Sequence, residues 1–158
     1  GDHIAYLDQY LEEFPEIVVL GHPETKIRKE NQFKSISHNH NFKIGELHFL
    51  ALHTPGHYYD SICYKLDSVI FTGDTLFVGR TGRVKSAGSD ISDLYDSIYN
   101  KLLTLPENTR IYPGHDYGDS PTITIKDNIK ISPLLQASDL SDFQQKMENY
   151  EQNRKPGT

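Results

Sequence analysis

Four short patterns in the chain place a histidine or an aspartate where its side chain could bind a metal ion. They are Gly1-Asp2-His3, Thr54-Pro55-Gly56-His57, Thr72-Gly73-Asp74-Thr75 and Pro113-Gly114-His115-Asp116. In three of them the polar residue follows a glycine at the end of an expected strand, which lets the backbone turn sharply and brings the next side chain close to a ligand. Three imidazoles and two carboxylates match the ligands of zinc, or of iron and manganese where oxygen ligands dominate. The sequence therefore predicts a metal site built from Asp2, His3, His57, Asp74 and His115.

Strands are expected to carry three of these patterns at their ends. Hydrophobic runs bounded by turn residues predict strands over residues 16–21, two within 33–53, then 61–66, 68–72 and 108–113. His57, Asp74 and His115 each follow one of these strands. Loops at the ends of rigid strands can aim side chains at a common point. We therefore expect the three to meet.

Helices are expected between and after the strands. Residues 4–14 carry apolar side chains on one helical face, and so do Leu94, Ile98 and Leu102 after a capping Ser89 or Asp90. A third helix is expected before Pro133, and a fourth over residues 140–153, whose apolar stripe favours core packing. Strands that alternate with helices predict one α/β domain over residues 1–158.

The composition excludes several classes of partner. The 158 residues are 36% hydrophobic and 24% charged, which is enough for one globular domain with a core. The net charge is −6 and the Lys and Arg residues are scattered, which argues against nucleic-acid binding. No apolar run approaches the roughly 20 residues of a membrane span, and no signal peptide opens the chain. The single cysteine, Cys63, is expected in the core, so we expect a cytoplasmic protein without an internal disulfide.

Taken together, the four patterns resemble the motifs of the metallo-β-lactamase superfamily, in particular its glyoxalase II-like branch, which includes persulfide dioxygenases. That family carries His-x-His-x-Asp-His, then Thr-Pro-Gly-His, Thr-Gly-Asp and Gly-His. Asp2-His3 match the end of the first motif, and His57, Asp74 and His115 match the later three. The resemblance extends from residue 1 to about 135. It implies the αββα sandwich of the superfamily, here without its N-terminal strands.

The resemblance also implies a role for each residue. Asp2, His3 and His115 would bind one metal, His57 the other, and Asp74 would bridge both. Two divalent cations, zinc first and iron or manganese as alternatives, would lower the pKa of a bridging water toward roughly 7 and supply hydroxide at neutral pH. Asp2 and Asp74 would thereby serve catalysis as well as metal binding.

Two residues are expected to contact the substrate. Arg83 matches the cation of the family's Cys-Gly-Arg loop, where Thr81 replaces the cysteine, and would bind a substrate carboxylate; an alternative is that it only fixes the loop. Tyr117 matches a position on the thiol side of the substrate. The other histidines are expected to be structural, and His53 is the best candidate among them for supporting a metal ligand.

Both ends of the chain differ from the family pattern. The His-x-His that should precede Gly1 is absent, so only His57 and Asp74 remain for the second metal. We therefore expect a fragment; if it were the whole protein, we would expect weak or no activity and an apolar sheet edge prone to association. Because only about 40 residues follow His115, we expect the helical lid of glyoxalase II to be absent or much reduced.

Three functions remain open from the sequence. The leading one is a metal-dependent hydrolase that cleaves a small-molecule thioester, similar to hydroxyacylglutathione hydrolases. The first alternative is an iron-dependent persulfide dioxygenase acting on a thiol-derived substrate, and the second is an inactive fragment or binding module of the same fold. A homodimer is left open, and neither nucleic acid nor a membrane is expected as a partner.

Overall fold

Six strands form the central sheet of the protein. The structure is a computed structural model, and it describes residues 4–26 and 31–153. The strands lie in the order β3 (His40–Ile44), β4 (Leu47–His53), β5 (Ile62–Leu66), β6 (Val69–Gly73), β7 (Arg110–Pro113) and β8 (Ile123–Thr124). Neighbours are antiparallel except β6 and β7, which are parallel. A separate parallel pair consists of β1 (Val19–Gly21) and β2 (Phe33–Ser35).

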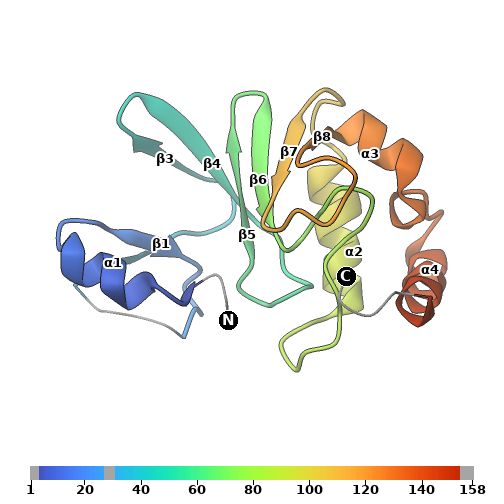
Figure 1. The fold of residues 1–158 in the computed structure, drawn as a ribbon, viewed down its shortest axis with the longest axis horizontal. Coiled ribbons are helices and arrows are strands. Elements are labelled where there is room, and N and C mark those ends of the chain that lie inside the picture. Colours follow the sequence, from blue (N-terminus) through green and yellow to red (C-terminus); the bar gives the residue numbers. More distant parts are fainter. Residues whose placement is uncertain (1–3, 27–30, 154–158) are drawn as a thin grey trace.

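The helices lie at two ends of the molecule. They are α1 (Leu7–Glu13), α2 (Ile91–Asp96) with its π-helical continuation η2 (Ser97–Leu102), α3 (Ile125–Ile131), the 3-10 turn η3 (Pro133–Leu135) and α4 (Leu140–Gln152). Figure 1 shows α1 beside β1 at one end and α3 and α4 beyond β7 and β8 at the other. The segment that contains α2 and η2 connects β6 to β7, as a parallel strand pair requires.

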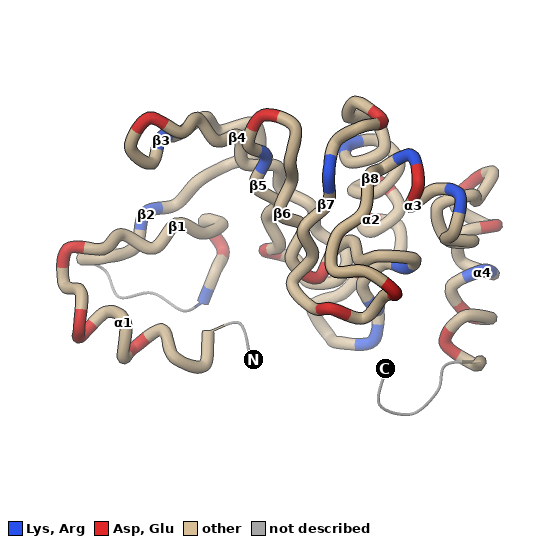
Figure 2. Tube along the Cα trace, turned by 45° about the horizontal axis from the view of Figure 1, so that its top comes forward, with Lys and Arg blue, Asp and Glu red and all other residues tan. Residues whose placement is uncertain are grey.

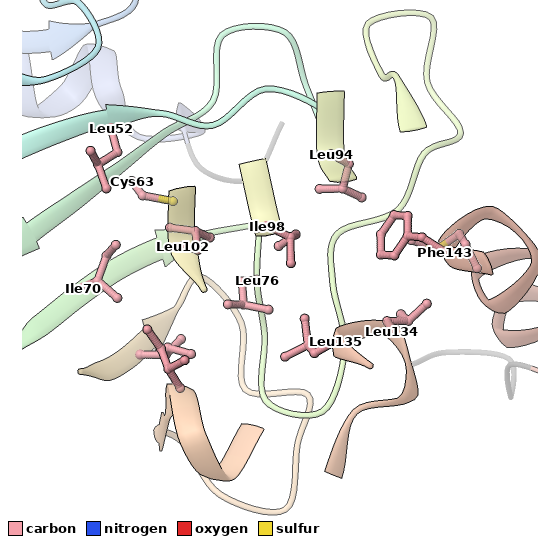
Figure 3. Packing of buried hydrophobic residues seen from close by; sticks show 13 residues of the cluster. Leu52, Cys63, Ile70, Leu76, Leu94, Ile98, Leu102, Leu134, Leu135 and Phe143 are labelled. Carbon is pink, nitrogen blue, oxygen red and sulfur yellow. The ribbon is translucent and has the colours of Figure 1, made fainter. Parts of the chain in front are cut away.

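The core forms where α2, η2 and α4 pack beside the sheet. Asp90 caps α2 because its side chain accepts hydrogen bonds from the backbone N–H groups of Ser92 and Asp93. The predicted face of Leu94, Ile98 and Leu102 is then completely buried. These side chains meet Cys63 and Ile70 from the strands, Leu134 and Leu135 from η3 and Phe143 from α4 (Figure 3).

Two predictions near the N-terminus are wrong in their details. The helix covers Leu7–Glu13 rather than residues 4–14, and of its apolar stripe only Leu11 is buried. The strand expected over residues 16–21 is reduced to β1, and Val18 is 58% exposed. The amphipathic patterns are present, but the described part of the chain offers little apolar surface for them to cover.

Charged residues are spread over the surface. Figure 2 shows Lys and Arg on several elements at both ends of the molecule, interspersed with Asp and Glu, whereas α1 carries acidic residues only. Within the described residues, no helix is both long and apolar enough to cross a membrane.

Candidate metal centre

The loop after β4 carries His57 and is fixed to the start of α2. Gly56 adopts a φ of +131°, and a Cβ atom at this position would lie 2.3 Å from the Cα of Leu94. Its carbonyl accepts a hydrogen bond from the Asp90 N–H at 2.9 Å. The carbonyl of Pro55 accepts one from the Ser97 hydroxyl at 2.7 Å. Only glycine allows this close approach, so the Pro-Gly-His pattern positions the imidazole through the backbone.

The turns that carry Asp74 and His115 lie side by side because β6 and β7 are parallel. Gly73, at the end of β6, has a φ of +49° and turns the chain into Asp74. Its carbonyl accepts a hydrogen bond from the Gly114 N–H at 2.8 Å, which joins the two turns directly. The Thr72 hydroxyl stabilises the first turn by donating to the carbonyl of Leu76 at 2.6 Å. The carboxyl ends of the two strands thus bring together residues 41 positions apart in sequence.

The carboxylate of Asp74 lies between two imidazoles. The Nε2 atom of His57 is 3.6 Å from one oxygen of Asp74, and the Nε2 atom of His115 is 3.5 Å from the other. Both distances exceed the 2.7–3.2 Å of an N–H···O hydrogen bond. They are close to the roughly 3.4 Å between two ligands of a tetrahedral zinc ion with bonds of about 2.0–2.1 Å. The donors therefore fit a metal between each imidazole and the carboxylate oxygen that it faces.

The three donors form two pairs rather than one cluster. Within residues 4–26 and 31–153, no group of three or more His, Cys, Asp or Glu side chains is arranged to hold a single ion. This agrees with the geometry, because His57 and His115 face different oxygens of Asp74. Each ion would need further donors. The predicted ligands Asp2 and His3 lie outside the described residues, so their role stays a prediction.

A backbone carbonyl orients the His57 ring. The Nδ1 atom of His57 lies 2.8 Å from the carbonyl oxygen of Arg83. A carbonyl can only accept, so Nδ1 carries the proton and Nε2 turns its lone pair toward Asp74. This is the support that a metal-binding histidine requires. The prediction that His53 supplies such support is wrong: its Nε2 contacts the carbonyl of Tyr59 at 2.8 Å, and its ring stacks on His22 at 4.1 Å.

An aromatic cluster lines the other side of the site. The ring of Tyr117 stacks on His115 with centroids 5.0 Å apart, and Phe77 contacts Tyr117 edge-on at 5.1 Å. Tyr117 also contacts the guanidinium of Arg80, whose Cζ atom lies 4.2 Å from the centroid of the tyrosine ring. The predicted substrate residue Tyr117 is thus in place beside His115, although its role as a substrate contact stays a prediction.

A cavity of about 110 Å³ opens at this cluster. It is lined by His57, Asp74, Phe77, Arg80, Thr81, Arg83, Tyr117 and Tyr150. The sequence motifs pointed to four of these residues, the two ligands together with Arg83 and Tyr117. The motifs did not point to Phe77 or Arg80. Both residues lie in the loop between Asp74 and Arg83, and this closeness in sequence to the motifs is the feature that could have identified them. Nothing in the sequence indicated that Tyr150 lines the cavity, because its position in the apolar stripe of α4 predicted core packing.

Arg83 lies at the cavity but contacts an acid of α4. Its guanidinium is 3.2 Å from the carboxylate of Glu151, which also binds Lys85 at 2.6 Å. Although burial acts in the opposite direction, the hydrogen bond from Lys85 and the charge of Arg83 hold the pKa of Glu151 below its ordinary value. A substrate carboxylate at Arg83 would have to compete with Glu151. The substrate role predicted for Arg83 therefore stays a prediction.

Comparison with known proteins gives one family. Residues 1–115 match the family model described as the metallo-beta-lactamase superfamily. The chain is 33% identical over 122 residues to a hydroxyacylglutathione hydrolase of Francisella philomiragia, covering 76% of this chain and 47% of that protein. It is 33% identical over 129 residues to the probable polyketide biosynthesis zinc-dependent hydrolase PksB of Bacillus subtilis, covering 80% of this chain and 57% of that protein. The chain thus spans about half the length of these curated relatives.

Comparison with solved structures agrees with the family match. The structure of ETHE1 from Myxococcus xanthus superimposes with a TM-score of 0.80 at 33% identity, covering 94% of this chain and 64% of that one. The expected fold class of mixed α/β sheets and helices is confirmed by this similarity.

Proposed function

Because the chain belongs to the metallo-beta-lactamase superfamily, we propose that it is part of a metal-dependent hydrolase that cleaves a small-molecule thioester. The observation that carries the proposal is the Asp74 carboxylate between the Nε2 atoms of His57 and His115, at 3.6 and 3.5 Å. Two relatives with about 33% identity are named as hydrolases, one of hydroxyacylglutathione and one zinc-dependent. Both points support hydrolysis rather than simple metal storage.

Each residue of the site has a distinct task in this proposal. When bound, two divalent cations would supply hydroxide at neutral pH and polarise the thioester carbonyl. Asp74 would bind both cations through its two carboxylate oxygens, which an imidazole cannot do. His57 and His115 offer neutral nitrogen ligands, and the carbonyl of Arg83 keeps His57 in the tautomer that this requires. Asp2 and His3 would complete the set around His115.

The test is elemental analysis of the intact protein combined with a screen of thioester substrates. We expect two zinc ions per chain and hydrolysis that Asp74→Asn lowers by at least 100-fold together with the metal content. The matched control is Asp119→Asn, which removes an exposed carboxylate four residues beyond His115. A protein whose metal content and activities are unchanged by Asp74→Asn would instead be a binding module of the fold.

A persulfide dioxygenase is the second candidate, and the similarity to ETHE1 favours it. The same residues would then serve a single iron, held by His57 and Asp74 with a further histidine. Oxygen uptake with a persulfide substrate separates the two functions. Iron at one ion per chain with oxygen consumption would support the dioxygenase, and two zinc ions without oxygen consumption would exclude it.

A further inference from the structure

A buried arginine lies in the cavity wall without an acidic partner in the described part of the chain. Arg80 is 7% exposed, and its guanidinium lies over the ring of Tyr117 at 4.2 Å. One of its terminal nitrogens donates to the hydroxyl of Tyr150 at 3.2 Å. The other, Nη2, is buried and makes no hydrogen bond. Among the residues that the structure describes, no carboxylate forms an ion pair with Arg80.

The two arginines of the cavity therefore differ in charge compensation. Arg83 is 46% exposed and pairs with Glu151, whose carboxylate it shares with Lys85. Arg80 is buried and keeps its full charge, because arginine does not lose its proton in proteins. Removing an unpaired cation from water is unfavourable, and an anion that binds beside it offsets this penalty. Arg80 is thus the better prepared of the two for an anionic ligand.

The helix α4 positions the second donor beside Arg80. Phe143 and Met147 of this helix are buried in the core, and Figure 3 shows Phe143 directed toward it. Tyr150 follows Met147 by three residues and so extends from nearly the same helical face. Its hydroxyl accepts from Arg80, which leaves its own proton available for a ligand. Arg80 and Tyr150 both line the cavity, so a guanidinium with an unused donor and a phenol hydroxyl lie together in one wall.

We propose that Arg80 and Tyr150 bind a carboxylate of the substrate, and that they, rather than Arg83, select anionic thioesters. The inference rests on the proposed function, because the same cavity is lined by His57 and Asp74. The cavity measures about 110 Å³, well below the roughly 300–1,000 Å³ of pockets for drug-sized ligands. The carboxylate therefore lies only a few bonds from the reacting carbonyl. Tyr117 contacts both groups, since its ring stacks on the predicted metal ligand His115 and lies against the guanidinium of Arg80.

The test compares two thioesters that differ only in charge, S-acetyl-3-mercaptopropionate and its methyl ester. For Arg80→Gln we expect kcat/KM on the carboxylate to fall about 10- to 100-fold, mainly through KM, because a hydrogen bond to a charged group contributes about 1.5–3 kcal/mol. The methyl ester should change by less than about threefold. Tyr150→Phe should show a smaller loss of the same kind. Arg110→Gln, at an exposed arginine of β7, is the matched control.

Binding without turnover provides an independent measurement. We expect 3-(methylthio)propionate, but not its amide, to raise the Tm of the wild type by a few degrees, and Arg80→Gln to abolish this difference. If Arg80→Gln fails to fold, Arg80→Lys serves instead, since it keeps the charge but loses the planar pair of donors.

Several outcomes would overturn the inference. An equal loss on both thioesters, or carboxylate selectivity that survives Arg80→Gln and disappears in Arg83→Gln, would contradict it. If the wild type hydrolyses neither thioester but still prefers the carboxylate in the Tm measurement, the thioesterase proposal fails and the anion site stands. If hydrolysis occurs with no preference for the carboxylate, the anion site fails and the thioesterase proposal stands.

Discussion

Gly82→Ala should damage the metal centre without changing any ligand. A Cβ atom at Gly82 would lie 2.0 Å from the carbonyl oxygen of Asp74 and 2.8 Å from the Cβ of His57. Real Cβ atoms essentially never approach another atom within 3.0 Å, so the Asp74 peptide or the loop of Gly82 must move by about 1 Å. Metal–ligand distances tolerate only about 0.2 Å, so this displacement separates the donors from the ions.

The expected effect is large on metal binding and moderate on folding. Overpacking of this kind costs about 1–3 kcal/mol, which lowers the Tm by roughly 2–12 °C for a domain of this size. Zinc affinity should fall at least about 10- to 100-fold, as it does when the support of a ligand is lost. Competition with a chromophoric chelator measures the affinity, and thermal unfolding of the metal-free protein measures the cost to folding.

The control variant, Gly45→Ala, separates the general effect of replacing a glycine by alanine from the steric effect at Gly82. Gly45 lies in the turn between β3 and β4 with a φ of +58°, and a Cβ atom there has no neighbour within 4 Å. Gly45→Ala should cost about 1–2 kcal/mol through backbone strain and leave zinc affinity unchanged. The reasoning is refuted if Gly82→Ala binds zinc within twofold of the wild type, or if both variants lose affinity equally.

Two further predictions concern groups away from the metal centre. Burial and the nearby charge of His53 lower the pKa of His22, and burial and the charge of Lys101 lower the pKa of His38. Below the ordinary histidine pKa of about 6.5, the folded protein therefore binds fewer protons than the unfolded chain. Stability in urea should therefore decline as the pH falls from 7 to 5, and a double variant with Gln at both positions should decline less; equal slopes would contradict this. Burial raises the pKa of Cys63 to about 11, so a thiol reagent at pH 7 should modify it only as the protein unfolds, and rapid modification of the folded protein would show that the site is open.

Local patterns predicted much of the fold because its signals lie within a few residues. Leu94, Ile98 and Leu102 recur at helical spacing after a capping Asp90, and all three are buried as expected. The second half of that helix is π-helical, which apolar spacing cannot distinguish from an α-helix. The same kind of pattern was misleading at residues 4–14. An apolar stripe is buried only where another element covers it, and the sequence of one segment does not say whether that element is present.

The candidate metal centre, too, has features that the sequence predicts and features that only the fold decides. His57, Asp74 and His115 could be found from the sequence because each needs a glycine before it, and that requirement is written into neighbouring positions. Which oxygen of Asp74 each imidazole faces depends on how the loop after β4 meets the turns after the parallel strands β6 and β7, and therefore only on the assembled fold.

The sequence by itself predicted the kind of chemistry, since the ligand types and the glycine turns are local properties. The tertiary structure alone decided which cation is prepared for a ligand. Arg80 and Arg83 are three residues apart in one loop, and the motif in the sequence pointed to Arg83 alone. Glu151 pairs with Arg83 and Tyr150 accepts a hydrogen bond from Arg80, and both come from α4, some 70 residues away. Charge compensation depends on what packs against a group, and for this loop the packing partner is a distant helix.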